Sequence, residues 1–407
     1  MKIVIIGNGP AAVKALEAIA HHRDASKEDI TSITIVSAEL TAPYSPMFLA
    51  DFLAGELGEE EILLGGDHDL FPQRLLGERV VKVENSQNKV VMESGREISY
   101  DKLLIASGAS PLKASIKGID KEGVHFFNRL ADAKRLSQQV PSAKNAIIIG
   151  AGAIGVEVAI AFNKIGISVL VVELLDQILP QILDEELARH VEGKLVSSGV
   201  RFILGESVSQ IIGGKRATGI VVSGKKEVSA DLVLVAAGVK PNIDFLRSSN
   251  VRVNQGILVN EKMQTSVPNI YAAGDVAESI DPYGEYELVF NWYNAVDQGW
   301  IAGCNLIGVA NTYRASPGLV ALKGLETPVI SIGRKYGENG YETLSFTDRG
   351  KGIYEKLFIE NNLIDCYQAI GIRDRVGLMY GYIKERKDIG NIKEVLFDIC
   401  CPVHFLA

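Results

Sequence analysis

The chain has 407 residues, of which 47% are hydrophobic and 23% charged, a composition that excludes an intrinsically disordered protein. Its formal net charge of −8 argues against nucleic-acid binding, because that function usually requires a basic surface. At about 150 residues per domain, the length indicates two or three domains. No apolar run approaches the roughly 20 residues of a transmembrane helix, and glycines interrupt the N-terminal run that imitates a signal peptide. We therefore expect a cytoplasmic protein.

In the first 110 residues, short apolar runs alternate with a helical segment, as in a parallel sheet with helical crossovers. The apolar runs are too hydrophobic to be half exposed, which is typical of strands buried on both faces. Three shorter strands form an expected hairpin-rich insertion before the last buried strand. In chain order, we expect a strand at 2–6, a helix at 11–21 and a strand at 33–36. The three strands of the insertion are expected at 80–83, 89–93 and 97–99, and the last buried strand at 103–106.

The same order of elements recurs in the next part of the chain, which predicts an internal duplication. The expected elements are 145–149, 154–164, 169–172, 208–212, 217–222, 226–228 and 232–236. From about Ser316 the pattern changes to successive antiparallel strands followed by one or two helices. These strands are expected at 329–333, 342–346, 354–359 and 363–370. We therefore predict an α/β protein with two Rossmann-like units and a C-terminal α+β domain.

A glycine-rich loop lies between the first strand and the first helix, where a dinucleotide-binding fingerprint is expected. It consists of Gly7, Asn8, Gly9, Pro10, Ala11 and Ala12. Gly7 permits the tight turn, Gly9 lets the backbone approach a pyrophosphate, and Ala12 stands where a small residue allows close packing. The helix N-terminus then offers free N–H groups to the phosphates. Such a loop is a weak signal by itself, because glycine-rich turns also serve packing.

A second and complete loop stands in the same context, and consists of Gly150, Ala151, Gly152, Ala153, Ile154 and Gly155. Glu173 ends the next strand, 23 residues after Gly150, where an acidic residue that binds the ribose hydroxyls is expected. Because its carboxylate would repel a 2′-phosphate and Leu174 and Leu175 supply no cation, we predict NADH over NADPH. In the first unit, the nearest candidate for a ribose contact is Glu39, which is almost as well explained as a surface residue.

These residues resemble the two-dinucleotide-binding flavoproteins of the pyridine nucleotide–disulfide oxidoreductase superfamily. The segment from Thr265 to Asp275 is similar to its second flavin signature, which implies that Gly274 and Asp275 bind FAD. Two segments resemble its crossover motifs. They contain Ala106, Ser107 and Gly108 in the first unit and Gly238 in the second.

The superfamily resemblance covers nearly the whole chain and implies three regions. We expect FAD to bind residues 1–110 and 240–315, NADH to bind residues 111–239, and residues 316–407 to form an interface domain, in a possible homodimer.

The segment from Pro43 to Leu49 resembles the flavin-side segment of rubredoxin and ferredoxin reductases and of the N-terminal half of NADH-dependent nitrite reductase. Those relatives usually have Lys or Arg where this chain has Pro46. The same resemblance places Glu157 near the nicotinamide, whereas Trp292 either lines the flavin or packs a domain interface. We expect Glu157, Pro46 and Trp292 to form the flavin and nicotinamide environment.

The four cysteines are Cys304, Cys366, Cys400 and Cys401, so none lies near the expected flavin-side segment. Disulfide reductases of this superfamily need a thiolate there, and no other side chain replaces it. Reduced flavin must therefore pass its electrons to an external acceptor. Cys400 and Cys401 are most simply structural residues. The six histidines show no spacing typical of metal ligands, so no metal site is expected.

We therefore expect an FAD-dependent NADH:acceptor oxidoreductase. The acceptor would be rubredoxin, ferredoxin or an iron–sulfur subunit of a larger complex, such as a 2-oxoacid (phenylglyoxylate-type) dehydrogenase or a nitrite reductase. An acidic chain needs a local basic patch to bind such acidic partners. The candidates for this patch are Arg373, Arg375, Lys384, Arg386 and Lys387. Two alternatives are a peroxide-forming NADH oxidase and a redox-responsive NADH-binding flavoprotein.

Overall fold

The computed structural model describes residues 1–26, 29–65, 70, 72–224, 226–334 and 340–397, which leaves His68, Cys400, Cys401 and His404 outside the described residues. The chain divides into two compact units. The first unit contains residues 1–47, 59–110 and 239–318, and the second contains residues 48–58, 111–238 and 319–407. The finer division into FAD, NADH and interface regions stays a prediction. Among the described residues, no helix combines the length and apolar character needed to cross a bilayer.

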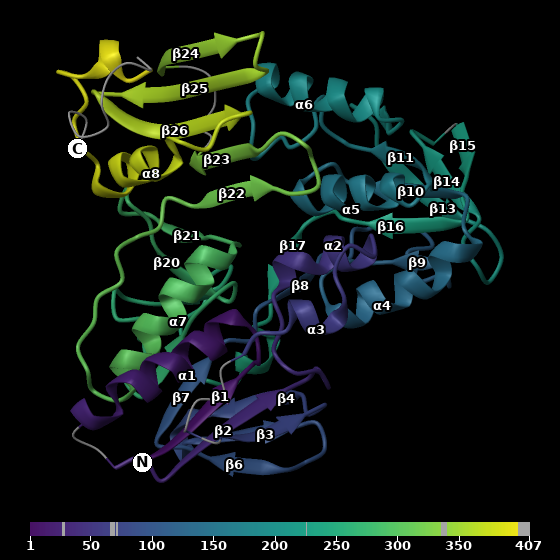
Figure 1. The fold of residues 1–407 in the computed structure, drawn as a ribbon. Helices are drawn as coiled ribbons and strands as arrows, with labels where there is room; N and C mark the ends of the chain where they lie inside the picture. The colour runs from purple at the N-terminus through teal and green to yellow at the C-terminus, as the bar shows by residue number, and fades with distance from the viewer. Residues whose placement is uncertain (27–28, 66–69, 71, 225, 335–339, 398–407) are drawn as a thin grey trace. The chain divides into compact units, whose positions relative to one another are not determined.

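The first unit is built on a five-stranded parallel sheet (Figure 1) with the strand order β19-β7-β1-β2-β3. In chain order its strands are β1 (Lys2–Ile6), β2 (Ser32–Ser37), β3 (Gln73–Leu76), β7 (Lys102–Ile105) and β19 (Ile270–Ala272). In β1, β2, β7 and β19 the apolar side chains are almost fully buried, as the continuous hydrophobic runs predict, whereas those of β3 are half-buried.

Helix α1 (Pro10–His22) follows β1 and packs against α7 (Trp292–Leu306). Two glycines of α7 make this packing close. A Cβ atom on Gly299 would lie 2.3 Å from the backbone oxygen of Ala11, and one on Gly303 would lie 2.4 Å from that of Ala15. The two helix backbones therefore approach each other without intervening side chains.

Smaller sheets and short helices complete the first unit. The inserted antiparallel sheet contains β4 (Val80–Glu84), β5 (Lys89–Met92) and β6 (Glu97–Ser99), which confirms the predicted hairpin region. A second small sheet contains β18 (Ile257–Leu258), β20 (Ala277–Ile280) and β21 (Tyr286–Leu288). The short helices are η1 (Arg23–Ala25), α3 (Glu59–Ile62), η4 (Asn85–Gln87) and η6 (Asp244–Leu246). Strands β8 (Ala109–Pro111) and β17 (Val239–Pro241) pair where the chain passes between its two units.

The second unit contains another five-stranded parallel sheet, ordered β12-β11-β10-β16-β9. Its strands are β9 (Val124–His125), β10 (Asn145–Ile149), β11 (Ser168–Val172), β12 (Arg201–Ile203) and β16 (Leu232–Val235). Its helices are α2 (Leu49–Leu53), α4 (Leu130–Gln139), α5 (Ala153–Lys164) and α6 (Glu185–Ser197), with the short turn η5 (Val140–Ser142). The turn η2 (Pro46–Phe48) begins in the first unit and ends at the first residue of the second. The inserted antiparallel sheet recurs as β13 (Val208–Ile212), β14 (Gly219–Val222) and β15 (Lys226–Ser229). This repetition confirms the predicted duplication.

The last part of the second unit is an antiparallel sheet with the order β22-β23-β26-β25-β24. Its elements are β22 (Leu319–Leu322), β23 (Val329–Gly333), β24 (Glu342–Asp348), β25 (Ile353–Glu360), β26 (Leu363–Ile370), α8 (Val376–Glu385) and η7 (Lys393–Val395). An ion pair between Lys356 and Asp184 joins this sheet to the segment that begins α6. The hydroxyl group of Ser331 also donates a 2.8 Å hydrogen bond to the backbone oxygen of Ile182.

Candidate cofactor sites

The glycine loop of the first unit has the geometry that a dinucleotide requires. Gly7 has a φ of +111°, and a Cβ atom there would lie 2.0 Å from the backbone oxygen of Ala106, so only glycine fits. Gly9 is the N-cap residue of α1, and its missing Cβ would meet nothing within 4 Å. The first N–H groups of α1 thus face open space, where a pyrophosphate can accept hydrogen bonds.

Asp275 follows β19 and lies next to this loop through Gly274. A Cβ atom on Gly274 would lie 3.1 Å from the Cβ of Ala11, and its N–H donates a 2.9 Å hydrogen bond to Gln298. Desolvation raises the pKa of the Asp275 carboxyl group to about 6. No described residue donates a hydrogen bond to this carboxyl group, so it fits a site at which a cofactor hydroxyl donates.

The crossover motif of the first unit is held by hydrogen bonds to Ile6 and Asn242, which lie far from it in the sequence. Ala106 continues the strand pairing by donating a 2.7 Å hydrogen bond to the backbone oxygen of Ile6. The hydroxyl group of Ser107 donates to the backbone oxygen of Asn242 at 2.9 Å, and the Asn242 amide donates back to Ser107 at 2.8 Å. Gly108 has a φ of +64° and open space where a Cβ would stand.

The structure shows side-chain partners for Glu39 and for the glycine loop of the first unit. The Glu39 carboxylate accepts a 2.8 Å hydrogen bond from the hydroxyl group of Tyr44. Arg74 donates a 2.5 Å hydrogen bond to the side chain of Asn8, whose amide donates to the backbone oxygen of Thr41. Arg74 is thus linked to the glycine loop, although no sequence pattern marks a cation on β3.

Two buried hydroxyl groups in this part of the first unit, those of Thr41 and Ser45, have no hydrogen-bond partner among the described residues. Buried hydroxyl groups are normally satisfied, so two orphans near one cofactor loop fit a site completed by a polar ligand. Together with Gly9 and Asp275, they support FAD as the group that this unit would hold. Pro46 is exposed in the turn η2, and Trp292 is half-buried at the start of α7. Their assignment to the flavin environment stays a prediction.

The second loop repeats this geometry in the second unit. Gly150 has a φ of +106°, and a Cβ atom there would lie 2.4 Å from the backbone oxygen of Ala236. A Cβ atom on Gly155 would lie 2.0 Å from the backbone oxygen of Gly150. Gly152 caps α5 and has open space in front of it. Helix α5 begins directly at Ala153 and Ile154, so its N-terminal N–H groups face that space.

Glu173 lies against this loop. Its carboxylate accepts hydrogen bonds from the N–H of Ala151 at 2.7 Å and from the N–H of Leu175 at 3.0 Å. The side chains of Leu174 and Leu175 are exposed and provide no positive charge. In the crossover segment, Gly238 has a φ of +100° and open space at its Cβ position. The second unit therefore places an anionic side chain, rather than a cation, beside its glycine loop.

Glu157 lies farther along α5 and belongs to a cluster of charged residues in the second unit. Its carboxylate accepts a 3.3 Å hydrogen bond from the backbone N–H of Lys323, directly after β22. The Lys323 ammonium group lies 3.7 Å from the Asp51 carboxylate and 3.4 Å from the ring centroid of Phe48. Desolvation raises the pKa of Glu157 to about 7. The sequence singled out Glu157 but missed Lys323, Phe48 and Asp51, which come from distant segments.

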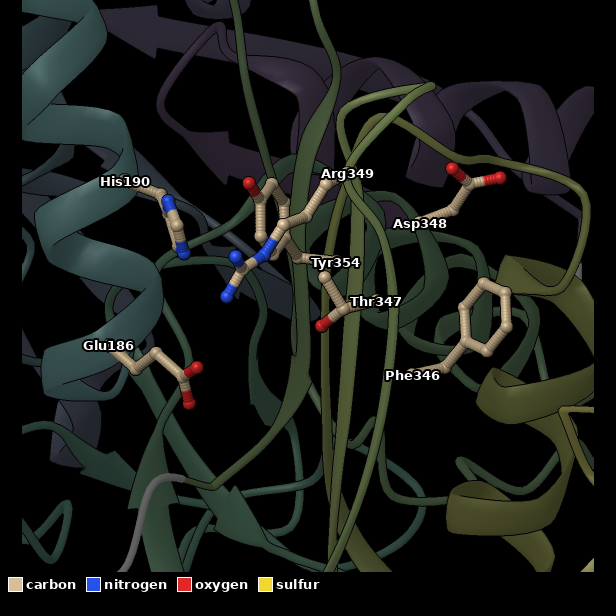
Figure 2. Close-up of a pocket in the computed structure, with 7 residues that line it drawn as sticks. All are labelled: Glu186, His190, Phe346, Thr347, Asp348, Arg349 and Tyr354. Atoms are coloured by element: carbon tan, nitrogen blue, oxygen red, sulfur yellow. The ribbon is translucent and has the colours of Figure 1, made fainter.

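The second unit also has an open groove of about 840 Å³ (Figure 2) between α6 and the strands β24, at the edge of the sheet, and β25 beside it. Its lining residues are Glu186, His190, Phe346, Thr347, Asp348, Arg349 and Tyr354. The rings of His190 and Tyr354 stack with centroids 3.9 Å apart. No predicted site residue lines this groove, and its charges are mixed.

In each parallel sheet one strand, β1 or β10, is followed by a glycine loop with open space at a helix N-terminus. Two such loops define a protein that binds two dinucleotides. A sequence profile described as pyridine nucleotide-disulphide oxidoreductase matches residues 1–299, and the chain belongs to this family. The family assignment confirms the predicted oxidoreductase class and the cofactors FAD and NADH.

Several characterised proteins are similar in sequence. The assimilatory nitrate reductase electron transfer subunit of Bacillus subtilis is 31% identical over 403 residues, which cover 98% of this chain and 51% of that protein. The NADH oxidase of Methanocaldococcus jannaschii is 34% identical, with 76% and 70% covered. Subunit epsilon of the NADH-dependent phenylglyoxylate dehydrogenase of Aromatoleum evansii is 30% identical, with 87% and 84% covered. The chain thus spans about half the length of the Bacillus relative.

The fold is also that of a solved reductase. The crystal structure of the covalent putidaredoxin reductase–putidaredoxin complex matches with a TM-score of 0.90 and 21% identity, covering 100% of this chain and 97% of that chain. This similarity confirms the predicted fold class.

Proposed function

We propose that this chain is an FAD-dependent NADH:acceptor oxidoreductase that passes electrons from NADH through FAD to an external redox partner. The observation that carries this proposal is the pair of glycine loops, one in each unit, together with a chain that has no cysteine before Cys304. Two dinucleotide sites support electron transfer from NADH, bound at one site, to FAD, bound at the other. Because no thiol lies in the flavin-side segment to accept electrons from the reduced flavin, these electrons must pass to an external acceptor.

The two cysteines within the described residues support the same exit. Cys304 and Cys366 are both buried, and burial raises the pKa of the Cys304 thiol. A buried thiol with a raised pKa is a poor nucleophile, because the thiolate is the reactive form. A disulfide relay within the described part of the chain is therefore not part of the proposal.

The protein's contribution to this reaction is binding and positioning, since FAD supplies the hydride-accepting chemistry when bound. In the first unit, the N–H groups after Gly9 would hold the pyrophosphate, and Asp275 would accept a hydrogen bond from a cofactor hydroxyl. In the second unit, α5 would hold the pyrophosphate of NADH. Glu173 would bind the ribose hydroxyls and exclude a 2′-phosphate by charge, which favours NADH over NADPH.

The acceptor that we propose is a small iron–sulfur protein such as rubredoxin or ferredoxin, or an iron–sulfur subunit of a larger complex. The names of the Bacillus and Aromatoleum relatives, an electron transfer subunit and a dehydrogenase subunit, support an exit to another protein.

The basic patch expected for this partner is smaller than the sequence indicates. Arg375 is bound to the fully buried carboxylate of Glu355, and Arg386 is paired with the buried carboxylate of Asp365. These two arginines therefore stabilise the C-terminal sheet, and the remaining candidates are Arg373, Lys384 and Lys387.

The test is an anaerobic titration of the purified, FAD-loaded protein with NADH and with NADPH, followed by stopped-flow reoxidation. We expect NADH to bleach the flavin absorbance, and rubredoxin or ferredoxin to restore it much faster than oxygen does. A protein that binds no FAD, or whose flavin NADH does not reduce, would contradict the proposal. Equal rates with NADH and NADPH would contradict the role of Glu173.

A second candidate is a peroxide-forming NADH oxidase, which the similarity to the Methanocaldococcus NADH oxidase favours. The same experiment separates the two functions. Fast reoxidation by oxygen with stoichiometric hydrogen peroxide, unaffected by added iron–sulfur protein, would favour the oxidase.

A further inference from the structure

We propose that Lys323, Asp51 and Glu157 form a proton-binding cluster on and beside helix α5. In this cluster Lys323 is a positioning residue that sets the proton affinity of the Glu157 carboxyl group. This inference rests on the proposed function, since it places Glu157 near the nicotinamide. The consequence is that binding of NAD⁺ releases a proton from Glu157, whereas binding of NADH leaves it in place.

Three separate segments of the second unit build the cluster. Phe48 and Asp51 come from the start of α2, Glu157 from α5 and Lys323 from the residue after β22. The Lys323 ammonium nitrogen is buried and makes no hydrogen bond to a described residue. Instead it lies over the Phe48 ring, with a distance of 3.4 Å to the ring centroid, and 3.7 Å from Asp51. A charge held in this way acts on its neighbours through space and through a cation–π contact.

Lys323 acts on Glu157 through two different groups. Its backbone N–H orients the carboxylate with a 3.3 Å hydrogen bond, which almost any residue at this position would supply. Its ammonium group lowers the free energy of the ionised carboxylate, which only a cationic side chain does. A substitution that changes the side chain alone therefore separates the charge from the hydrogen bond.

The charged groups of the cluster shift one another in opposite directions. Desolvation raises the pKa of Glu157, the hydrogen bond and charge of Lys323 lower it, and the charge of Asp51 raises it. Desolvation lowers the pKa of Lys323, which Asp51 and Glu157 raise. Desolvation also raises the pKa of Asp51.

Beyond these three residues, Glu56 and Lys164 act on Asp51. They form their own ion pair at 2.6 Å, so their opposite charges largely cancel at the cluster.

The two nicotinamide oxidation states differ in charge, and the cluster distinguishes them. With Glu157 protonated, the charges of Asp51 and Lys323 cancel, which suits the neutral ring of NADH. With Glu157 ionised, the cluster carries one negative charge, which suits the cationic ring of NAD⁺. In the release step the O–H bond of Glu157 breaks, the proton passes to the buffer, and no electron moves.

The experiment is calorimetric titration of the FAD-loaded protein with NAD⁺ from pH 6 to pH 9, in pairs of buffers with different ionisation enthalpies. The difference between buffers counts the protons released for each NAD⁺ bound. For the wild type we expect release near neutral pH that disappears by pH 9. Glu157→Gln should abolish it.

Lys323→Met keeps the backbone N–H and the length of the side chain but removes the charge. Because the carboxylate then loses its cation, we expect the release profile to move to higher pH by about one unit. Lys323→Arg should restore the wild-type profile. Lys215→Met is the matched control, because it removes an exposed lysine of the same unit that pairs with Glu122 and is distant from the cluster in charge and contact, and it should leave the profile unchanged.

An identical release profile in the wild type and Glu157→Gln would overturn the proposal, and so would superimposed profiles of the wild type and Lys323→Met. If Lys323→Met does not fold by circular dichroism, Glu157→Gln still decides the outcome. Bleaching of the flavin by NADH is measured on the same samples. A protein whose flavin is reduced by NADH, but which releases no proton on binding NAD⁺, contradicts only the cluster. A protein whose flavin NADH does not reduce contradicts the proposed function.

Discussion

The glycine loops of the two units share a backbone and differ in their surroundings. In both loops the first glycine, Gly7 or Gly150, has a positive φ and lies against the backbone oxygen of an alanine in the crossover segment. In the second unit a glutamate, Glu173, is bonded to the loop itself. In the first unit the corresponding strand ends in Ser37, and Glu39 is bonded to Tyr44 instead.

This difference shows which part of a dinucleotide site is fixed by the backbone. The close contact between the glycine loop and the crossover segment leaves no room for a side chain, so both units have a glycine at this position. The polar groups around the cofactor are side chains, and each unit arranges them independently. In the first unit, Asp275 comes from a segment more than 200 residues away, next to a glycine that lies against Ala11.

The largest effects are expected where the loops are alike. Gly7→Ala or Gly150→Ala would place a Cβ atom within 2.4 Å of a backbone oxygen, at a φ that other residues rarely adopt. We expect each change to destabilise its unit by about 3 kcal/mol or more. Denaturant unfolding followed by circular dichroism measures this loss.

Gly9→Ala and Gly152→Ala are the matched controls, because their added Cβ atoms would meet nothing within 4 Å. They should retain the fold and weaken dinucleotide binding, since the space in front of them is where a pyrophosphate approaches. Equal destabilisation by Gly7→Ala and Gly9→Ala would contradict the steric comparison.

The next effect concerns Asp275 of the first unit. Asp275→Ala should weaken FAD binding by about 10- to 100-fold, because a hydrogen bond to a charged group contributes about 1.5–3 kcal/mol. The measurement is the dissociation constant of FAD from fluorescence titration of the FAD-free protein. Asp275→Asn, which retains the shape of the side chain, should lose less affinity than Asp275→Ala. Unchanged affinity in Asp275→Ala would remove this residue from the cofactor site.

Glu173 tests the second unit. Glu173→Ala should lower the ratio of kcat/KM for NADH to that for NADPH by about tenfold, because one charged hydrogen bond and one repulsive charge are removed together. The measurement is steady-state reduction of an artificial acceptor with each nucleotide. Glu39→Gln is the comparison from the first unit, and it should leave this ratio unchanged. A fall in the ratio of the same size for Glu39→Gln would contradict independent arrangement of the two sites.

The smallest effect is a pH dependence of the FAD-free protein. The pKa of Asp275 is raised from 3.8 to about 6 in the folded state, so the folded state binds more protons than the unfolded state between these values. The stability that this proton provides is therefore present below pH 4 and lost as the pH rises through 6. Relative to Asp275→Asn, we expect the Tm of the wild type to fall by a few degrees across this range. A parallel pH dependence of the two proteins would contradict the desolvation of Asp275.

The sequence predicted the parallel sheets, both glycine loops and the repeated insertion, because these features depend on local pattern. The continuous apolar runs of β1 and β10 and the glycines that follow them lie within a few residues of one another. Helices α4 and α6 and strands β3, β12 and β22 were missed, and these strands have only three or four residues each.

The partners of the cofactor loops were less predictable, because they are set by tertiary contacts. Arg74 reaches Asn8 across 66 residues, and Lys323 reaches Glu157 across 166. No local spacing marks either pair. The predicted basic patch lost two of its members for the same reason, since Arg375 and Arg386 bind buried carboxylates on neighbouring strands.

The close packing of α7 on α1 has a consequence for the order in which the chain is synthesised. When the first 240 residues have left the ribosome, both glycine loops exist, but β19 and α7 do not. The exposed edge of β7 and the bare alanine face of α1 then lack their partners, because Ile270–Ala272 and Gly299 have not been made. We therefore expect the nascent chain to acquire FAD only after residue 306 has emerged, while the nucleotide fold of the second unit, within residues 111–238, is already complete.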